Sequence, residues 1–510
     1  MKFFTKVLVL ALFSLTACVE EKVQITALYL DTMELYLDVG QSQRLVATTR
    51  PADAPVTFTW FSSDETIATV TQDGLVTLVS DGTATVTAMW GSYRRSCVVT
   101  TAGLKLEKDK LYLSPGGSAQ LVAVMRPYDE NAVYTWESSN EEIAIVDENG
   151  VVSYKQPGTT IITVSYKGYS SECEVFCLNA SPWDFRNALS NPLSGSLLYS
   201  KNVIIGTSGR IMQGFDILTD ETIYYSQVSN DGKSVLISRA DGPGVNTSAT
   251  MTLMYFGHGT QIAVERTNDG DYIWVGSSGT YTDGEYGNNL SFSRVKFEAG
   301  KTHKSYAGDT FVFSGTGEYD LQISLDFETR KLLVGTRKSG QRHFWIFNLD
   351  EVLSLSKKDV IISTQVEGAT KESVINARDL SECTPISKFS VSSGVNKDTD
   401  VYSYSHQGHE IVGDYIYFYE GNAIEDGSQY YSKAYLTTFN YGGEIVVPRT
   451  EVKAIADKAN LQALGITTIG YAEAESLKIK GNTLYLGIAC HNGSNAKRYA
   501  NILKYEGVNQ

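Results

Sequence analysis

Two consecutive stretches decide how the rest of the chain is read: RIMQGFDILTDETIYYSQVSNDGKSVLISRAD at 210–241 and MTLMYFGHGTQIAVERTNDGDYIWVGSSG at 251–279. Each begins with a short polar or glycine cluster, Gln213-Gly214 in the first and Gly257-His258-Gly259 in the second. An apolar strand, an acidic or glycine turn and an aromatic strand follow in both. Alternating apolar residues bounded by Asn, Asp and Gly are typical of paired antiparallel strands.

The same plan recurs three more times downstream. The later copies begin at 321–326, 406–411 and 473–479. Loose copies of several short strands, spread over about 300 residues, are typical of a β-propeller in which each copy forms one blade. The sequence therefore predicts a five-bladed β-propeller over 210–510. Because an open sheet edge invites aggregation, we expect the junction at 179–209 to supply a closing strand within 196–205.

One insertion between the fourth and fifth copies predicts a helix. Thr450 stands where an N-cap residue is expected, and Gly465 lies just past the end of the segment. This pairing of residues is typical of helix ends. We interpret the segment as a peripheral insertion.

The first 17 residues have the pattern of a secretory signal peptide. Lys2 and Lys6 precede a mostly apolar run that is too short to remain in a bilayer as a spanning helix. The run ends Leu15-Thr16-Ala17-Cys18, which resembles the lipobox of bacterial lipoproteins. The resemblance implies cleavage before Cys18 and lipid attachment to its thiol, followed by a linker over 18–24. Acidic residues directly after such a cysteine are typical of surface-exposed outer-membrane lipoproteins in the Bacteroidetes.

A tandem repeat defines two further domains, over 25–102 and 103–178. Trp60 recurs as Trp136 and Cys97 as Cys173, each pair 76 residues apart with no interrupting insertion. Each copy is a run of short alternating strands around one tryptophan, as in a small β-sandwich with the tryptophan in its core.

Both copies resemble the bacterial immunoglobulin-like domain, group 2. In the first copy the resemblance is carried by Trp60-Phe61-Ser62-Ser63-Asp64, Ile67-Ala68-Thr69-Val70 and Gly82-Thr83-Ala84-Thr85-Val86. The second copy matches at Trp136-Glu137-Ser138-Ser139-Asn140 and Ile143-Ala144-Ile145-Val146. The family implies a spacer or adhesion module without catalytic residues. The predicted fold class is all-β: two immunoglobulin-like sandwiches followed by a five-bladed propeller.

The composition argues against a nucleic-acid partner. The formal net charge is −15, whereas binding to a phosphate backbone needs clustered Lys and Arg. The acidic balance likewise argues against docking on anionic lipid, so contact with a membrane is expected only through the lipid anchor. The 31 tyrosines suit strands and surfaces that face sugars or peptides.

The propeller segment resembles the β-propeller shared by phage receptor-binding tail proteins, the teichoic-acid biosynthesis protein C group and helveticin-like bacteriocins. The motifs are Gly257-His258-Gly259-Thr260-Gln261-Ile262, Tyr272-Ile273-Trp274 and Ser293-Arg294-Val295-Lys296-Phe297. Glu473-Ala474-Glu475-Ser476-Leu477 fits a Glu-x-Glu-Gly-Leu pattern of that family, with Ser476 in place of glycine. The family implies recognition of cell-surface polymers, typically glycans.

Polar residues at the blade starts are candidates for a site on the propeller axis, where they could hold a divalent cation. The alternative is a water-filled polar tunnel whose groups hydrogen-bond one another. These candidates are Gln213, His258, Gln407, His409, Glu473 and Glu475.

Loop aromatics with neighbouring polar residues are candidates for ligand binding, because aromatic faces stack on sugar rings. These candidates are Tyr281, Asp283, Tyr286, Asn288, Tyr430 and Tyr431.

Three functions are consistent with these patterns. The leading hypothesis is a non-catalytic recognition protein that binds a polysaccharide or another surface polymer. The alternatives are an extracytoplasmic polysaccharide lyase or hydrolase that uses the axis His, Gln and Glu groups with a cation, and an adhesin that binds protein. Nucleophile motifs do not support a hydrolase, because Gly276-Ser277-Ser278-Gly279 lacks the strand–elbow–helix setting.

Overall fold

The computed structural model describes residues 24–52, 54–202, 211–229, 232–243, 247–282, 285–366, 369–426, 429–466, 471–491 and 498–509. The predicted signal peptide and Cys18 lie outside these residues. The chain forms two compact units. The first holds the residues up to Phe176 except Gln156–Gly158, and the second holds those three residues and Cys177–Gln510.

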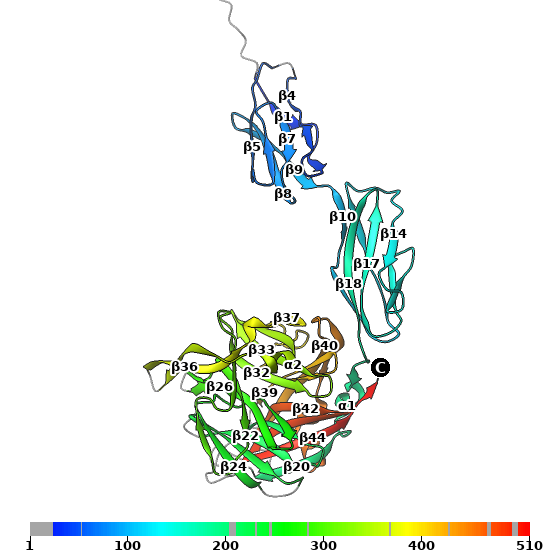
Figure 1. Ribbon diagram of the computed structural model, residues 1–510. Coiled ribbons are helices and arrows are strands. Elements are labelled where there is room, and N and C mark those ends of the chain that lie inside the picture. The colour runs from blue at the N-terminus through cyan, green and yellow to red at the C-terminus, as the bar shows by residue number, and fades with distance from the viewer. Residues whose placement is uncertain are drawn as a thin grey trace, which may run out of the picture. The chain divides into compact units, whose positions relative to one another are not determined.

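The first unit contains the two predicted sandwiches (Figure 1). The strands of the first copy are β1 (Ala27–Leu30), β2 (Glu34–Leu37), β3 (Ser42–Arg44), β4 (Ala47–Arg50), β5 (Thr59–Ser62), β6 (Ala68–Val70), β7 (Leu75–Leu78), β8 (Thr83–Trp90) and β9 (Tyr93–Thr101). Those of the second copy are β10 (Gly103–Leu106), β11 (Lys110–Leu113), β12 (Ser118–Gln120), β13 (Ala123–Arg126), β14 (Thr135–Ser138), β15 (Ala144–Val146), β16 (Val151–Tyr154), β17 (Gly158–Tyr166) and β18 (Tyr169–Cys177).

The two copies have the same sheet order. A four-stranded sheet β2-β9-β8-β5 and a three-stranded sheet β3-β7-β6 in the first copy correspond to β11-β18-β17-β14 and β12-β16-β15 in the second. Trp60 is buried with Leu35, Val76 and Cys97, which confirms its predicted core position. Its counterpart Trp136 is partly buried and packs against a smaller core cluster.

A glycine beneath each tryptophan is required by both backbone and space. Gly150 has φ +81°, and a Cβ there would lie 2.6 Å from the Trp136 ring and 2.9 Å from the Leu121 carbonyl oxygen. The repeat therefore retains glycine at this position because a left-handed turn brings the backbone against the indole.

Gly150→Ala is expected to destabilise the second sandwich by about 2–3 kcal/mol, because left-handed strain adds to overpacking. Gly116→Ala is the matched control, since Gly116 has φ +75° with no atom within 4 Å of its Cβ position. It should cost about 1 kcal/mol through backbone strain alone. Urea unfolding of the full chain measures both. Equal costs for the two variants would contradict the packing contribution.

The described residues of the second unit form five sheets of four to six strands. The first is β21 (Met212–Ile217), β22 (Ile223–Val228), β23 (Ser234–Ala240), β24 (Thr247–Met254) and β30 (Thr302–Lys304). The second is β25 (Ile262–Thr267), β26 (Gly270–Ser277), β29 (Ser291–Lys296), β31 (Asp309–Val312), β36 (Ala369–Asp379) and β35 (Lys358–Val366). The third is β32 (Tyr319–Asp326), β33 (Lys331–Lys338), β34 (Gln341–Asn348) and β37 (Ser387–Ser392).

The last two sheets follow the same order. The fourth is β38 (His406–Val412), β39 (Tyr415–Asp426), β40 (Gln429–Asn440) and β41 (Ile445–Glu451), and the fifth is β42 (Tyr471–Lys480), β43 (Thr483–His491), β44 (Arg498–Glu506) and β20 (Ser196–Asn202). Small additional strand pairs are β19 (Trp183–Asp184) with β45 (Val508–Asn509), and β27 (Thr280–Thr282) with β28 (Glu285–Gly287).

The five first strands, β21, β25, β32, β38 and β42, are neighbours in cyclic order. Each contacts the next one along the chain, and β42 contacts β21. The expected strand from the junction is present, because β20 pairs antiparallel with β44, from Ser196 opposite Lys504 to Asn202 opposite Tyr499. An early segment therefore completes the last sheet (Figure 1).

The second sheet contains strands that the repeat pattern did not predict. The hairpin β35–β36 lies between β34 and β37 in the chain, yet β36 pairs parallel with β31 of the second sheet. Likewise β30 pairs parallel with β24 of the first sheet. These pairings join each sheet to a segment from outside its own repeat.

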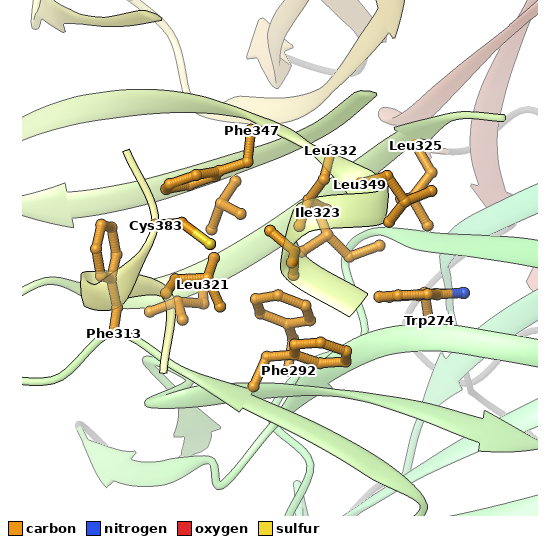
Figure 2. Close-up of a cluster of buried hydrophobic side chains, with 14 of the residues drawn as sticks. Trp274, Phe292, Phe313, Leu321, Ile323, Leu325, Leu332, Phe347, Leu349 and Cys383 are labelled. Atoms are coloured by element: carbon orange, nitrogen blue, oxygen red, sulfur yellow. The ribbon is translucent and has the colours of Figure 1, made fainter. Parts of the chain in front are cut away.

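Large apolar side chains fill the space between neighbouring sheets. In the cluster of Figure 2, Trp274, Phe292 and Phe311 of the second sheet pack against Leu321 and Ile323 of the third. Phe292 and Phe311 stack with ring centroids 4.8 Å apart. Strands β26 and β33 are buried on both faces over 273–277 and 332–336, whereas β35, β36 and β37 keep exposed positions.

Ion pairs and hydrogen bonds join neighbouring first strands. Lys478 on β42 donates to Glu410 on β38 at 2.8 Å, and both side chains are at most 4% exposed. Ser324 on β32 also donates to Glu410, at 3.0 Å. At the end of β42, Lys480 is 41% exposed and pairs with the buried Asp216 of β21 at 2.8 Å, and Asp216 accepts from the Val264 amide of β25. These contacts link four neighbouring pairs of first strands.

The predicted helix begins later than the sequence indicated. Thr450 lies in strand β41, and the N-cap is Asp457, which accepts from the Ala459 amide at 2.7 Å. The helix α3 (Lys458–Ala463) is six residues long and follows a 3-10 turn (Lys453–Ile455). Gly465 does lie just past its end, with φ +93°. The other helices described are α1 (Arg186–Ser190) and α2 (Leu349–Ser354), and no described helix is long and apolar enough to cross a membrane.

Candidate binding cavity

A polar cavity of about 450 Å³ lies at the starts of three first strands, β25, β32 and β38. Its lining combines the segment before β25, the loop after β28, the β33–β34 hairpin and the segment before β38. The lining residues are His258, Gly259, Thr260, Gln261, Gly276, Gly287, Asn288, Asn289, Asp320, Leu321, Gln322, Arg337, Arg342, Tyr402, Ser405 and His406.

The Gly-His-Gly motif has a local structural reason. Gly257 has φ +84°, and a Cβ there would lie 2.0 Å from Oδ1 of Asn289. A Cβ on Gly276 would lie 1.7 Å from Nδ2 of the same residue. The Asn289 amide is thereby seated between two glycines and donates to the Phe256 carbonyl oxygen at 3.1 Å. This arrangement fixes the Asn288-Asn289 loop beside His258 at the cavity wall.

Two arginines of the β33–β34 hairpin supply positive charge. Arg342 is 3% exposed and donates from Nη2 to Asp320 at 3.0 Å. Its Nε and Nη1 are buried and have no hydrogen-bond partner among the residues that the structure describes. Arg337 lies over the Tyr319 ring at 5.8 Å. A buried guanidinium that uses only one of its three nitrogens is costly unless a further acceptor is bound.

A histidine pair forms the adjoining wall. His406 lines the cavity, and its Nε2 lies 3.0 Å from Nδ1 of His409, which packs behind it against Gly335. Burial, followed by the charge of Arg342, holds the pKa of both imidazoles well below the usual value. Both rings are therefore neutral at pH 7. The side-chain amide of Gln261 donates to the backbone carbonyl oxygen of His409 and accepts from its backbone N–H. These two bonds hold the segment before β25 against β38.

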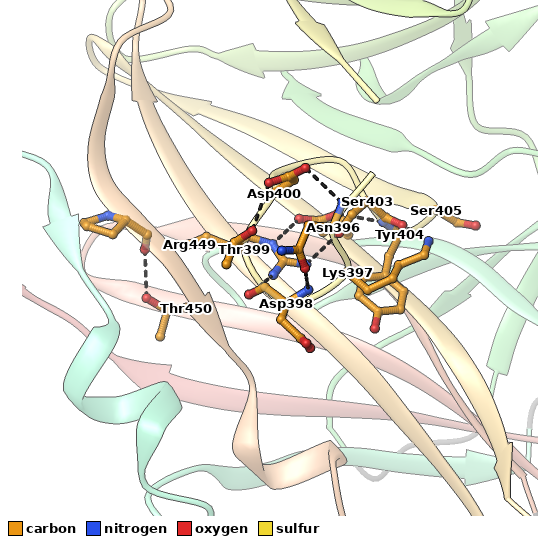
Figure 3. A network of polar contacts seen from close by, with 12 residues as sticks. Asn396, Lys397, Asp398, Thr399, Asp400, Ser403, Tyr404, Ser405, Arg449 and Thr450 are labelled. Carbon is orange, nitrogen blue, oxygen red and sulfur yellow. Dashed lines mark hydrogen bonds and ion pairs between the residues drawn. The ribbon is translucent and has the colours of Figure 1, made fainter. Parts of the chain in front are cut away.

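The loop before β38 is anchored by a network centred on Arg449 (Figure 3). Arg449 pairs through Nε with Glu420 at 2.7 Å and donates from Nη2 to Ser403 at 3.0 Å. The other Glu420 oxygen accepts from the Tyr404 amide at 2.9 Å. The guanidinium also stacks on Tyr435, 3.4 Å from the ring centroid. The network positions the segment that brings Tyr402, Ser405 and His406 to the cavity.

Only some of the residues that the sequence analysis proposed as site residues line the cavity. His258 and Asn288 line the cavity, and His409 lies directly behind its lining. Gln407 donates to the Gly421 carbonyl oxygen of β39 at 2.8 Å and is not a lining residue. Gln213, on β21, is partly buried and also lies outside the lining.

The two glutamates of β42 share one face, because they lie two residues apart on a strand. Glu475 is 5% exposed, and burial together with the charge of Glu473 raises its pKa well above the usual value. Neither glutamate lines the cavity. Among the described residues, no group of three or more His, Cys, Asp or Glu side chains is placed to hold a metal ion.

Glu475→Gln is expected to stabilise the second unit at pH 8 but not at pH 4. The raised pKa means that the folded state holds a proton that the unfolded state releases, so stability falls as pH rises from the unfolded pKa toward the folded one. Below about pH 4 the carboxyl group is protonated in both states, and the contribution vanishes. Thermal unfolding of both proteins at pH 4 and pH 8 measures the difference. An equal difference at both pH values would show that packing, rather than ionisation, is responsible.

The loop candidates are dispersed. Tyr281 is 37% exposed on β27, and Tyr431 is partly buried on β40 opposite Ile424. Neither lines the cavity. Asp283 and the side chains of Tyr286 and Tyr430 lie outside the described residues.

Residues 24–100 match the family model of the bacterial immunoglobulin-like domain (group 2). This match covers the first sandwich. The second immunoglobulin-like domain is matched over 130–167 by a different model, that of the intimin immunoglobulin-like domain. The immunoglobulin-like part of the prediction is therefore confirmed, although the second domain matches the intimin model rather than group 2.

Proteins similar to this chain include an uncharacterised protein of Clostridium acetobutylicum, 30% identical over 30% of this chain and 17% of that protein. Ice-binding protein 1 of Shewanella frigidimarina is 22% identical over 37% of this chain and 22% of its own length. An alpha-L-arabinofuranosidase of Bifidobacterium longum is 34% identical over 22% of this chain and 11% of its own length. The chain thus spans less than a quarter of each of these relatives.

Similar solved structures include domains 4 and 5 of the S-layer protein SbsC, with 17% identity and a TM-score of 0.15 over 30% of this chain and 99% of that one. Kuenenia stuttgartiensis hydrazine synthase aligns over 75% of this chain and 76% of its own, with 10% identity and a TM-score of 0.26. TM-scores this low do not establish a shared fold.

Sequence reasoning missed the three charged Arg and Asp residues of the cavity and the amide Gln322. Arg337, Arg342, Asp320 and Gln322 were not among the candidates, although Arg342 carried a usable signal. On β34 it lies in phase with Phe344 and Ile346, both fully buried, so it points toward the interior. A charged residue at a core-facing position of a strand indicates a functional or paired role.

Proposed function

We propose that this chain is a non-catalytic, cell-surface recognition protein whose second unit is a five-bladed β-propeller that binds a polysaccharide or another surface polymer. The observation that carries the proposal is the polar cavity at the starts of β25, β32 and β38. Its wall presents amide, imidazole, hydroxyl and guanidinium groups, which are the groups that fix sugar hydroxyls and their charged substituents.

The sheet arrangement supports the propeller. Five sheets follow one another along the chain, their first strands are neighbours in cyclic order, and β20 adds the last strand to the fifth sheet. Closure of this kind protects strand edges that would otherwise be exposed. The resemblance to the propeller of phage receptor-binding proteins, carried by the motif around His258, points to the same kind of head.

The immunoglobulin-like domains over 25–102 and 103–178 act in this proposal as spacers. Such domains occur on surface proteins. Cys18 would carry, on its thiol, the lipid that holds the chain at the outer membrane. In cells, Cys18→Ala is expected to move the protein from the membrane fraction to the soluble extracytoplasmic fraction. Retention of the variant in the membrane fraction would refute the lipid anchor while leaving ligand binding untouched.

A glycan array with residues 25–510 tests the function. The array is probed with and without a chelator, and the bound glycans are examined by mass spectrometry. Saturable binding without cleavage is the expected result. Cleaved products would establish an enzyme instead, and absence of any glycan signal would favour a protein partner. Loss of binding in chelator would bring a cation into the site.

A further inference from the structure

We propose that the cavity binds an oxyanion, so that the polymer recognised is an acidic polysaccharide. This inference rests on the proposed function and narrows its ligand to a polymer that carries carboxylate, sulfate or phosphate groups. It begins from the unpaired nitrogens of Arg342 and from the sign of the charges that surround them.

Arg342 is only partly satisfied by the protein. Asp320 accepts from one nitrogen at 3.0 Å, while Nε and Nη1 have no partner among the described residues, although the side chain is 3% exposed. Asp320 is itself held in place by Gln322, which donates to it at 3.2 Å. A guanidinium offers several donors in a planar fork and suits oxyanions better than any other side chain.

The charges of the lining favour an anion. Arg337 and Arg342 are cationic, and Asp320 is the carboxylate among the lining residues. His406 adds no charge at pH 7, because its pKa is lowered by burial and by Arg342. The described wall is therefore cationic, in a chain whose formal net charge is −15. A positive pocket within an acidic surface selects ligands that place an anion there and rejects uncharged analogues.

The rest of the lining suits a sugar. The Oε1 of Gln322 is buried, has no hydrogen-bond partner within the described part of the chain, and can accept from a hydroxyl group. Asn288 and Ser405 provide further polar groups from two other segments of the lining. A cavity of about 450 Å³ falls within the range of small-ligand sites, so it would take a short segment of a polymer rather than a whole chain.

The test compares each acidic polysaccharide with its own neutral form. Polygalacturonate is measured against its carboxyl-reduced product, and chondroitin sulfate against its desulfated product, by calorimetry with residues 25–510. The expected result is that one acidic form binds at least about tenfold more tightly than its neutral form. The neutral form lacks the charged contact with the arginines, and loss of such a contact weakens binding by about this factor. Competition by free sulfate or free phosphate distinguishes these anions from a carboxylate.

The variant Arg337→Gln tests whether this arginine contributes to binding. Arg337 is partly exposed, so its replacement should leave the fold intact. It should weaken binding of the acidic form about tenfold and leave the neutral form unchanged. The matched control is Arg330→Gln, which removes the same charge just before β33, roughly 23 Å along the strand. This control should bind as the unmodified protein does.

The outcomes separate the two proposals. Equal binding of acidic and neutral forms, unaffected by Arg337→Gln, would overturn the oxyanion site and leave polysaccharide recognition standing. If Arg337→Gln and Arg330→Gln weakened binding of the acidic form equally, long-range charge would explain the loss of affinity. That result would also overturn the oxyanion site. Absence of binding to every polymer would overturn the proposed function and this inference with it.

Discussion

Lys478→Met should destabilise the second unit by about 3–5 kcal/mol, because it leaves Glu410 charged, buried and without its cation. Both side chains are at most 4% exposed, and their contact is 2.8 Å. Burial already raises the pKa of Glu410 despite the opposing charge of Lys478. Removal of the lysine leaves that burial cost without its main compensation. Hydrogen-exchange mass spectrometry in increasing urea measures the loss for each unit separately.

The double variant Lys478→Met/Glu410→Gln distinguishes an unpaired charge from lost packing. It should recover most of the stability, because an amide oxygen can still accept from Ser324 and no buried charge remains. Arg330→Met is the matched control for an exposed pair, since Arg330 and Asp350 are 39% and 63% exposed. It should cost less than about 1 kcal/mol. If the double variant were as unstable as Lys478→Met, packing would be the cause.

Arg449→Lys should destabilise the fourth sheet by about 3 kcal/mol although it keeps the charge. Arg449 is 6% exposed, donates to Ser403 (Figure 3), pairs with Glu420 and stacks on the Tyr435 ring. A lysine ammonium cannot make these planar contacts simultaneously, so Glu420, which is 0% exposed, would lose part of its compensation. Thermal unfolding measures the stability change.

The same substitution should weaken ligand binding, because the network anchors the loop that carries Tyr402, Ser405 and His406 to the cavity. Limited proteolysis should cut within 393–405 faster in the variant than in the unmodified protein. Lys433→Met is a suitable control, since Lys433 is partly exposed and its distance to Asp398 is 3.9 Å. Unchanged proteolysis in Arg449→Lys would contradict the anchoring role.

Much of the architecture was predictable from local pattern. The repeated polar cluster, apolar strand and aromatic strand correctly placed the first two strands of all five sheets, from Phe215 to Leu486. Period-two alternation and turn residues are local properties, so they survive in the sequence as readable signals. The tandem tryptophan repeat similarly indicated two sandwiches, and Gly150 shows why its glycines recur.

Pairings between distant segments were not predictable in the same way. Nothing local marks β35–β36 as an addition to the second sheet, because a strand's partner depends on which edge is free after the chain has folded. The helix start was misplaced for a related reason. Thr450 is an acceptable cap, but its pairing with Leu436 keeps it in β41 and shifts the cap to Asp457.

By itself, the sequence determined the all-β class, the two immunoglobulin-like copies and the order of the five repeated units. It also placed His258 at the start of a repeated unit and Asn288 in a loop. Only the tertiary structure brought these residues together with Arg337, Arg342 and His406. The reason is physical. The cavity is made where the starts of β25, β32 and β38 converge, and these strands, which contact one another in cyclic order, begin about 60 to 90 residues apart in the chain.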